Sequence, residues 1–223
     1  MSDHATVVIT GANRGIGLEL ARHYAARGLA VIGVCREASP ELTEVAARVI
    51  DGVDVTTDQG VARLKAELQG QSIDLLINNA GLLQDEVLGH IDFDSIRTQM
   101  EINAYAPLRV TEALVPQIPS GGKIANITSR MGSIADNDSG GRYGYRASKA
   151  ALNAFGKSLA MDLKPKGIAV IQLHPGYVKT RMVNFGGIIS PAESALGLAA
   201  RIDELDLENT GTFWHCNGEL LPW

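Results

Sequence analysis

Hydrophobic residues along the chain fall into short runs that alternate with longer amphipathic segments. The short runs are rich in β-branched residues and predict strands at 6–10, 30–34, 49–53, 73–78, 123–128, 168–173 and 211–215. The intervening segments repeat apolar residues with the helical period and predict helices at 16–27, 40–48, 58–68, 94–115, 143–163 and 191–202. The strands are nearly continuous apolar runs, so we expect both faces of their sheet to be covered.

This alternation predicts an α/β fold. Strands joined by helices pair in parallel, and right-handed crossovers then give a doubly wound sheet of about seven strands with helices on both faces. No linker interrupts residues 1–223, so we expect a single domain. Such sheets bind ligands at the carboxyl ends of their strands, and candidate functional residues should therefore follow the strands.

The composition narrows the class of partner. The net charge of −5 and the scattered basic residues argue against a nucleic-acid surface. We find no apolar run long enough to cross a bilayer and no signal peptide before the first strand, so we expect no membrane partner. Cys35 and Cys216 are interpreted as reduced thiols of a cytoplasmic protein. The histidines lack the spacing of metal ligands, and we expect no metal site.

Three glycines follow the first predicted strand. Gly11 permits a tight turn, and Gly15 and Gly17 let the backbone and the next helix approach a diphosphate closely. The helix N-terminus would offer free N–H groups and the positive end of its dipole to that anion. This spacing is not the usual G-x-G-x-x-G fingerprint, so a glycine-rich turn without a ligand stays open as an alternative.

Tyr145 and Lys149 lie four residues apart in a predicted helix, which puts them on one helical face. A free tyrosine has a pKa near ~10, too high for acid–base chemistry at neutral pH. A neighbouring cation favours the phenolate and lowers that pKa, so the pair is a candidate for proton transfer. Such a spacing also arises by chance, and the surrounding residues must decide.

Four motifs occur in order along the whole chain. They are Thr-Gly-x-x-x-Gly-x-Gly at 10–17, Asn-Asn-Ala-Gly at 78–81, Tyr-x-x-x-Lys at 145–149 and Pro-Gly-x-Val-x-Thr at 175–180. Together they resemble the short-chain dehydrogenases/reductases. The segments at 11–20 and 218–223 are similar to the small carbonyl-reductase or C-factor-like branch.

The resemblance implies a nicotinamide-dependent oxidoreductase built as one NAD(P)-binding Rossmann domain. Tyr145 would be the general acid in carbonyl reduction and the base in the reverse direction, and Lys149 would lower its pKa. Ser129, favoured over the adjacent Thr128, would hold the substrate oxygen. Asn103 would hold a proton-relay water near the lysine; the alternative is a helix-bend residue that bonds to backbone.

The resemblance also implies a set of cofactor contacts. They are Gly11, Asn13, Arg14, Gly15, Ile16, Gly17, Arg36, Asp54, Val55, Asn79, Ala80, Gly81, Tyr145, Lys149, Pro175, Gly176, Val178 and Thr180. After the second strand, NAD enzymes of this fold place an acid for the ribose hydroxyl, whereas here Arg36 would suit a 2′-phosphate. Arg14 would add a second positive charge. We therefore predict NADP(H) over NAD(H), although Glu37 weakens this argument and a solvated Arg36 is the alternative.

These features predict NADP(H)-dependent reduction of an aldehyde or ketone to an alcohol, with a small carbonyl or alcohol compound as substrate. A non-catalytic dinucleotide-binding regulatory or signalling protein stays open, as does alcohol oxidation as the physiological direction. The polar loop at 136–141 could shape the substrate mouth, and the short segment between 180 and 191 implies an open site. Pairing through the two long helices would give a homodimer, with a tetramer as the alternative.

Overall fold

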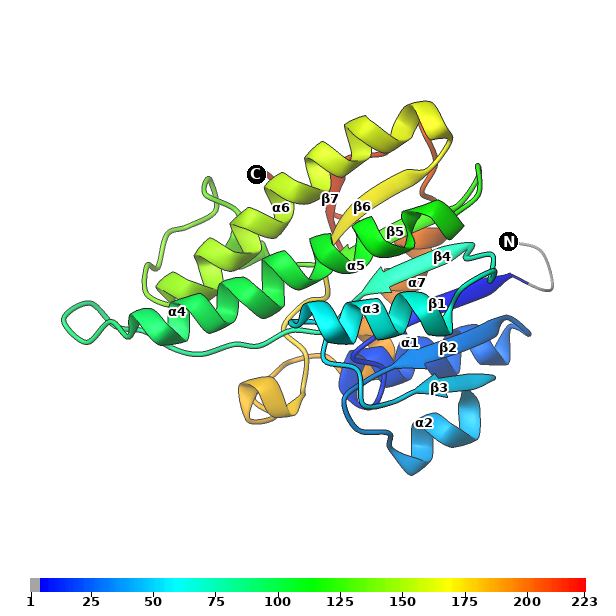
Figure 1. The fold of residues 1–223 in the computed structure, drawn as a ribbon. Coiled ribbons are helices and arrows are strands. Elements are labelled where there is room, and N and C mark those ends of the chain that lie inside the picture. Colours follow the sequence, from blue (N-terminus) through cyan, green and yellow to red (C-terminus); the bar gives the residue numbers. More distant parts are fainter. Residues whose placement is uncertain (1–4) are drawn as a thin grey trace.

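One parallel sheet forms the centre of the structure (Figure 1). The structure is a computed structural model that describes residues 5–223; the expectation that no signal peptide precedes the first strand concerns residues 1–4, which lie outside this range. The strands are β1 (Thr6–Thr10), β2 (Ala30–Val34), β3 (Arg48–Ile50), β4 (Leu75–Asn78), β5 (Lys123–Ile127), β6 (Ala169–His174) and β7 (Thr212–His215). Their order is β3-β2-β1-β4-β5-β6-β7, and neighbouring strands pair in parallel. The predicted seven-stranded sheet is confirmed.

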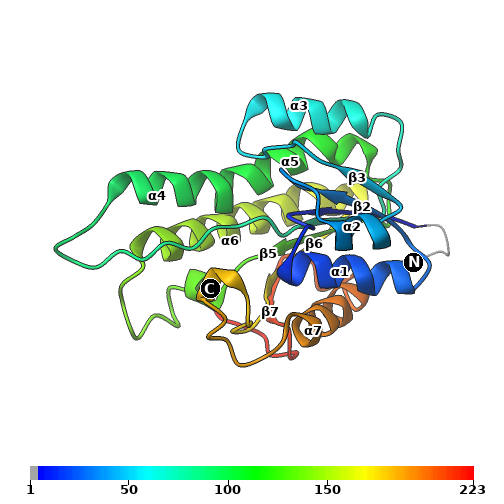
Figure 2. The same cartoon turned by 90° about the horizontal axis from the view of Figure 1, so that it is seen from below.

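Helices cover both faces of this sheet, as predicted (Figure 2). One face carries α1 (Gly15–Ala26), α2 (Pro40–Val45) and α7 (Pro191–Asp203), and the other carries α3 (Asp58–Glu67), α5 (Ala106–Leu114) and α6 (Tyr143–Leu163). Alternate residues of a strand supply the two cores: Val7 and Ile9 pack in the first, and Val8 packs in the second. Burial on both faces explains why the strands are continuous apolar runs.

The long helix predicted at 94–115 is present and contains one π-helical turn. It consists of α4 (Phe93–Met100), a π-helical turn (Glu101–Tyr105) and α5. Asp92 caps α4 by accepting hydrogen bonds from the backbone of residues 94 and 95, so the helix begins one residue earlier than predicted. The π turn contains Asn103, whose side chain bonds to the backbone of Leu82 in a neighbouring loop.

The boundary predicted between residues 48 and 49 is also wrong. Helix α2 ends at Val45, and Ala46 is already extended with ψ 139°. Strand β3 then begins at Arg48, because Arg48 to Ile50 pair with β2, and it ends before Gly52 turns the chain away. Pairing with a neighbouring strand thus outweighs the local helical pattern.

The remaining elements are short or end the chain. The 3₁₀ helices are Val115–Gln117, Arg130–Gly132, Lys164–Lys166 and Arg181–Val183. A capping box starts α7, with Ser190 and Glu193 bonding to each other's backbone N–H groups. Within residues 5–223, every helix is too short or too polar to cross a bilayer.

The strand order fixes where a ligand can bind. β1 lies between β2 and β4, so the chain leaves β1 and β4 toward opposite faces of the sheet. A crevice therefore opens beyond the carboxyl ends of these two strands, at the topological switch point. The candidate residues at 11–17 and 79–81 follow β1 and β4 directly.

Candidate active site

Tyr145 and Lys149 lie in the first two turns of α6, and both are buried, at 7% and 4% exposure. The Nζ atom of Lys149 is 5.8 Å from the centre of the Tyr145 ring, so the spacing does bring the pair together. Nζ also donates a hydrogen bond of 2.9 Å to the carbonyl oxygen of Ile127, at the end of β5. The pair is thereby anchored at the carboxyl edge of the sheet.

Burial dominates the acid–base properties of the pair. It raises the pKa of Tyr145 to about 12, and the contact with the Ser129 hydroxyl and the charge of Arg142 oppose this rise. Burial lowers the pKa of Lys149 to about 7. The lowering of the tyrosine pKa by Lys149 stays a prediction, because the charge that lowers it in the protein alone is that of Arg142. The reason is that burial destabilises the ammonium form of Lys149 itself.

Ser129 faces Tyr145 from the end of β5. Its hydroxyl accepts a hydrogen bond of 3.1 Å from the backbone N–H of Met131 and so starts the 3₁₀ turn at Arg130–Gly132. The neighbouring hydroxyl of Thr128 donates instead to the carbonyl oxygen of Lys149, at 3.3 Å. The hydroxyl of Thr128 is therefore engaged by the backbone of α6. The hydroxyl that contacts the Tyr145 phenol is that of Ser129, the residue favoured by the sequence register.

Asn103 is fully buried, and its side chain forms hydrogen bonds with groups of the protein. Its Nδ2 donates to the carbonyl oxygen of Leu82 at 2.7 Å and to Oγ of Ser148 at 3.0 Å, and its Oδ1 accepts from the N–H of Leu82 at 2.8 Å. It lies close to the lysine, because a Cβ added to Gly81 would be 3.1 Å from Asn103 Oδ1 and 3.7 Å from Lys149 Nζ. The geometry matches the backbone-bonding interpretation, and the proton-relay role stays a prediction.

The glycine turn has the backbone expected of a diphosphate site. Gly11 and Gly15 adopt φ values of +66° and +56°, which favour glycine. A Cβ on Gly17 would lie 2.3 Å from the carbonyl oxygen of Gly11, so the helix and the turn are packed too tightly for a side chain. No side chain caps α1, whose N-cap is the exposed Arg14. The first N–H groups of α1 can therefore serve an anion.

Asn79 and Thr10 hold this turn against β4. Asn79 Nδ2 donates to the carbonyl oxygens of Thr10 at 3.0 Å and Gly11 at 3.1 Å. Thr10 Oγ1 accepts from the N–H groups of Asn79 at 3.0 Å and Ala80 at 3.2 Å. The side chain of Asn79 thus shapes the glycine turn rather than pointing freely to a ribose. Sequence reasoning missed the role of Thr10, for which a hydroxyl at the last strand position was the available signal.

Arg36 and Asp54 lie at the side of the crevice beyond β2 and β3. The amide of Asn13 donates to the carbonyl oxygen of Glu37 at 2.9 Å and joins this region to the glycine turn. Hydrogen bonds from the hydroxyl and N–H of Thr56 hold the pKa of Asp54 below its usual value, with a smaller contribution from the charge of Arg36. Arg36 is exposed and, among the described residues, forms no ion pair, so its guanidinium is available to a phosphate.

The segment after β6 returns to the glycine turn. A Cβ on Gly15 would lie 3.5 Å from Cγ2 of Thr180, so these two candidate sites are adjacent. Gly176 has φ +85°, and the carbonyl oxygen of Pro175 is fixed by the hydroxyl of Ser194 at 2.7 Å. The apolar residues among the candidate cofactor contacts have buried or partly buried side chains; they are Ile16, Val55 and Val178.

His174 lies at the end of β6 and packs against a second histidine. Burial lowers its pKa to about 3, and its ring packs edge-on against His215 with the ring centres 4.8 Å apart. It is therefore neutral at physiological pH and unsuited to bind protons there. Within residues 5–223, no group of His, Cys, Asp or Glu has the arrangement of a metal site.

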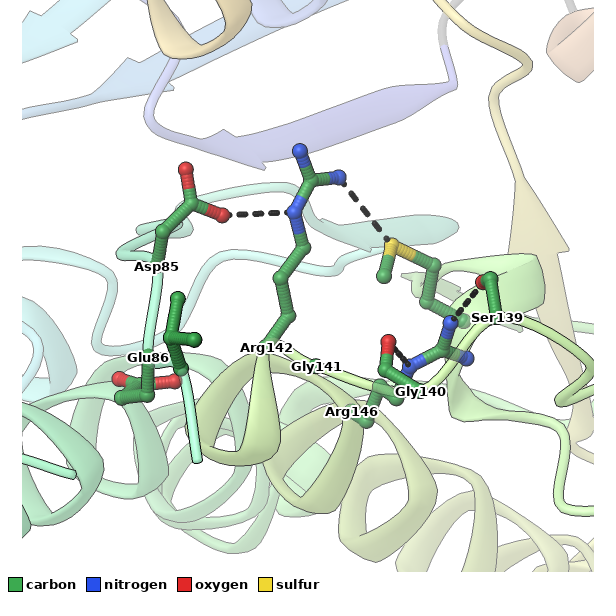
Figure 3. A pocket seen from close by; sticks show the side chains of 9 residues that line it. Asp85, Glu86, Ser139, Gly140, Gly141, Arg142 and Arg146 are labelled. Carbon is green, nitrogen blue, oxygen red and sulfur yellow. Dashed lines mark hydrogen bonds and ion pairs between the residues drawn. The ribbon is translucent and has the colours of Figure 1, made fainter. Parts of the chain in front are cut away.

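A hollow of about 340 Å³ opens between the loop after β4 and the segment that leads into α6 (Figure 3). Part of its wall is the polar loop at 136–141 that the sequence assigned to the substrate mouth. Arg142 donates to Asp85 at 2.6 Å and to the sulfur of Met131 at 3.7 Å. Met131, which lies two residues after Ser129 in the chain, also lines this hollow.

Comparisons with known proteins agree with this geometry. Residues 5–186 match the family described as short chain dehydrogenase. The chain is 40% identical to 1-hydroxy-2-glutathionyl-2-methyl-3-butene dehydrogenase of Rhodococcus sp. strain AD45, over 98% of this chain and 100% of that protein. It is 42% identical to C-signal of Myxococcus xanthus over 68% of this chain and 93% of that protein. The fold matches NADPH-bound carbonyl reductase from chicken fatty liver with a TM-score of 0.85 and 28% identity, over 99% of both chains.

Proposed function

Because the chain belongs to the short-chain dehydrogenase/reductase family of oxidoreductases, we propose that it reduces a small aldehyde or ketone to an alcohol with NADP(H). The observation that carries this proposal is the contact between the Ser129 hydroxyl and the Tyr145 phenol beside Lys149, at the carboxyl edge of the sheet. Two hydroxyl groups there can converge on one carbonyl oxygen, next to a turn built for a diphosphate.

Each residue then has a defined task. The nicotinamide, when bound, supplies the hydride. Ser129 orients the carbonyl oxygen, and both hydroxyls stabilise the negative charge that develops on it. Tyr145 holds its proton at neutral pH, because burial raises its pKa to about 12, and can pass that proton to the oxygen. The ammonium form of Lys149 would stabilise the phenolate left behind.

The preference for NADP(H) rests on charge. Arg36 and Arg14 are exposed at the two sides of the crevice where the adenosine half of the cofactor would lie, and Asn13 connects their segments. A guanidinium pairs with a 2′-phosphate through charge-assisted hydrogen bonds. The carbonyl reductase from chicken, whose fold this chain shares, was solved with NADPH bound.

Alcohol oxidation is a second candidate. The relative from Rhodococcus is named as a dehydrogenase of a hydroxy compound, and it matches this chain along its full length. The same residues serve both directions, because Tyr145 is the acid in reduction and the base in oxidation. In the oxidation direction, the pKa of about 12 makes a faster reaction at alkaline pH the expected signature.

A signalling function is favoured by the similarity to C-signal. In that case the fold and the cofactor crevice would matter and proton transfer would not. The intact Tyr145, Lys149 and Ser129 argue for catalysis, since a pure binding protein has no need to bury a tyrosine and a lysine together. We also propose a cytoplasmic location, which suits the free, buried thiols of Cys35 and Cys216.

The test is a panel of aldehydes, ketones and quinones, read at the nicotinamide absorbance with NADPH and with NADH. We expect turnover with at least one carbonyl compound, a preference for NADPH, and a loss of roughly 100-fold or more in kcat for Tyr145→Phe, as expected for removal of a general acid. Tyr145→Phe with the turnover of the wild type would contradict the assigned mechanism. Full biological activity of that variant would instead support the signalling function.

A further inference from the structure

A polar zipper, buried at Glu86, Gln99 and Asn103, joins the loop after β4 to the start of the catalytic helix. On the helical side, polar residues recur every four positions along one face of α4 and the π turn. On the loop side, every second residue of an extended segment makes the contacts. The members are Leu82, Gln84, Glu86, Ser95, Gln99 and Asn103. Gln99 and Asn103 are fully buried, and Glu86 is 2% exposed. None of these contacts is needed to build the sheet.

Glu86 is the centre of the zipper. Its Oε1 accepts hydrogen bonds from Ser95 Oγ at 2.6 Å and from Gln99 Nε2 at 2.5 Å, and its Oε2 accepts from the N–H of Gly144 at 2.9 Å. Its carbonyl oxygen accepts from the N–H of Arg142 at 3.0 Å. Arg142 is the N-cap of α6 and makes no capping bond with its own side chain. A carboxylate from a distant loop therefore closes the N-terminus of the catalytic helix.

The other end of the zipper holds the same helix one turn further on. Asn103 Nδ2 donates to Ser148 Oγ at 3.0 Å, and Ser148 Oγ donates to the carbonyl oxygen of Tyr145 at 2.8 Å. The backbone is thus tied at Gly144, just before the catalytic tyrosine, and at the tyrosine itself. Gly144 leaves no slack, because an added Cβ would lie 2.9 Å from Glu86 Oε1.

Asp85 and Glu86 show how selective this arrangement is (Figure 3). The carboxylate of Asp85 points toward Arg142 and forms an ion pair in which both side chains are largely exposed, so the pair contributes little. Glu86 turns the other way, toward α4. A buried carboxylate with every oxygen hydrogen-bonded is costly to disturb, and its geometry is correspondingly well defined.

We propose that Glu86 is a positioning residue of the active site, which acts through Gly144 to hold the first turn of α6 and so fixes the Tyr145 phenol against Ser129. The proposal rests on the proposed function, in which Tyr145 is the proton donor. Glu86 itself touches neither substrate nor cofactor. A displacement of the phenol by about 1 Å would cost on the order of 100-fold in rate.

Three substitutions of Glu86 separate positioning from charge. Glu86→Gln can keep an oxygen on Gly144 N–H, but its amide nitrogen then faces Nε2 of Gln99, which is also a donor, so we expect it to lose less kcat than Glu86→Asp. Glu86→Asp keeps the charge but is too short to reach Gly144, and it should lose kcat by roughly 10–100-fold, as should Glu86→Ala. If the alanine variant does not fold, the comparison of Gln with Asp still decides. The matched control is Asp94→Ala, which removes a carboxylate from α4 whose side chain is 90% exposed.

The readouts are kcat, KM and the pH profile of kcat, measured well below the melting temperature of every variant, with NADPH affinity by fluorescence titration. In the Asp and Ala variants, we expect kcat to fall while KM and NADPH affinity stay near wild type. We also expect the pKa of Tyr145 to rise, because its contact with Ser129 weakens. Wild-type kcat in the Asp or Ala variant, or equal loss in Gln and Asp, would overturn the proposal. Tyr145→Phe is run in parallel: if it keeps full activity, the proposed function fails instead.

Discussion

Among single residues, we expect Arg36 to decide between NADPH and NADH. Removing its guanidinium deletes a charge-assisted hydrogen bond to the 2′-phosphate, so we expect Arg36→Ala to raise the Kd for NADPH by roughly 10–100-fold and to leave that for NADH nearly unchanged. Fluorescence titration with both cofactors measures this. Arg22→Ala, which removes an exposed arginine from α1, is the control. Equal weakening of both cofactors by Arg36→Ala would show that the residue does not read the phosphate.

His174 gives the protein a specific sensitivity to acid. The pKa of His174 is about 3 in the folded chain, whereas an unperturbed histidine has a pKa of 6.5. Between pH 3 and pH 6.5 the unfolded chain therefore binds more protons than the folded chain. The stability that neutral His174 contributes is complete above pH 6.5 and is lost as the pH falls toward 3, at up to about 1.4 kcal/mol per pH unit.

Urea unfolding of the wild type and of His174→Gln across this range tests the prediction. Both chains share the other groups beside the ring, namely His215, which titrates, and Arg130, which stays charged. We expect the free energy of unfolding of the wild type to fall more steeply on acidification than that of the variant. Parallel curves would mean that His174 is protonated in the folded protein.

The start of α1 is the element on which cofactor binding depends most. Alanine favours helices more than glycine does, yet a Cβ at Gly17 would lie 2.3 Å from Gly11 O and 2.5 Å from Asn79 Nδ2. The turn must move to admit it, so we expect Gly17→Ala to weaken NADPH binding by roughly 10-fold or more. Arg22→Ala in the same helix should bind normally. Unchanged affinity in Gly17→Ala would show that the turn does not hold the diphosphate.

The sequence predicts elements well where the local pattern decides them. The predicted bounds of the strand Ala30–Val34 and the helix Tyr143–Leu163 are correct, because the spacing of their apolar residues indicates which faces are buried. The π turn at Glu101–Tyr105 was not predicted, because Asn103 bonds to Leu82, 21 residues away. Contacts of that range leave no periodic signal.

The same limit applies to the candidate site. The motifs brought Tyr145, Lys149 and Ser129 together correctly, but their pKa values depend on burial, which spacing does not reveal. Glu86 was missed, since a carboxylate in a polar loop resembles a solvated side chain. The recurrence of polar residues at 95, 99 and 103 on one helical face was the signal that could have found it.

At the scale of the whole molecule, the open question is assembly. Helices α4 and α5 run end to end alongside α6, and α4 reaches beyond the edge of the sheet (Figure 1). Exposed apolar side chains occur along these helices, including Tyr105 at 42% and Met161 at 58%, with Tyr105 packed 6.3 Å from Phe155 between ring centres. We propose a two-fold dimer through these helices, with a tetramer as the alternative.

Sedimentation of the wild type and of Tyr105→Asp tests the dimer. Burying a carboxylate in an apolar interface is costly, so we expect a dimer for the wild type and a shift toward monomer for the variant. Arg97→Ala, which changes an arginine of α4 whose side chain is 73% exposed, serves as the control. A wild type that sediments as a monomer at micromolar concentration would contradict the proposed interface.

The central claim is that a hydride passes from the nicotinamide to a carbonyl carbon while Tyr145 supplies the proton. Mass spectrometry of the alcohol formed from NADPH deuterated at the transferring position of the nicotinamide tests it most directly. We expect one deuterium on the carbinol carbon with the wild type and a loss of roughly 100-fold or more in its rate of appearance with Tyr145→Phe. An alcohol without deuterium, or equal rates for the two proteins, would contradict it.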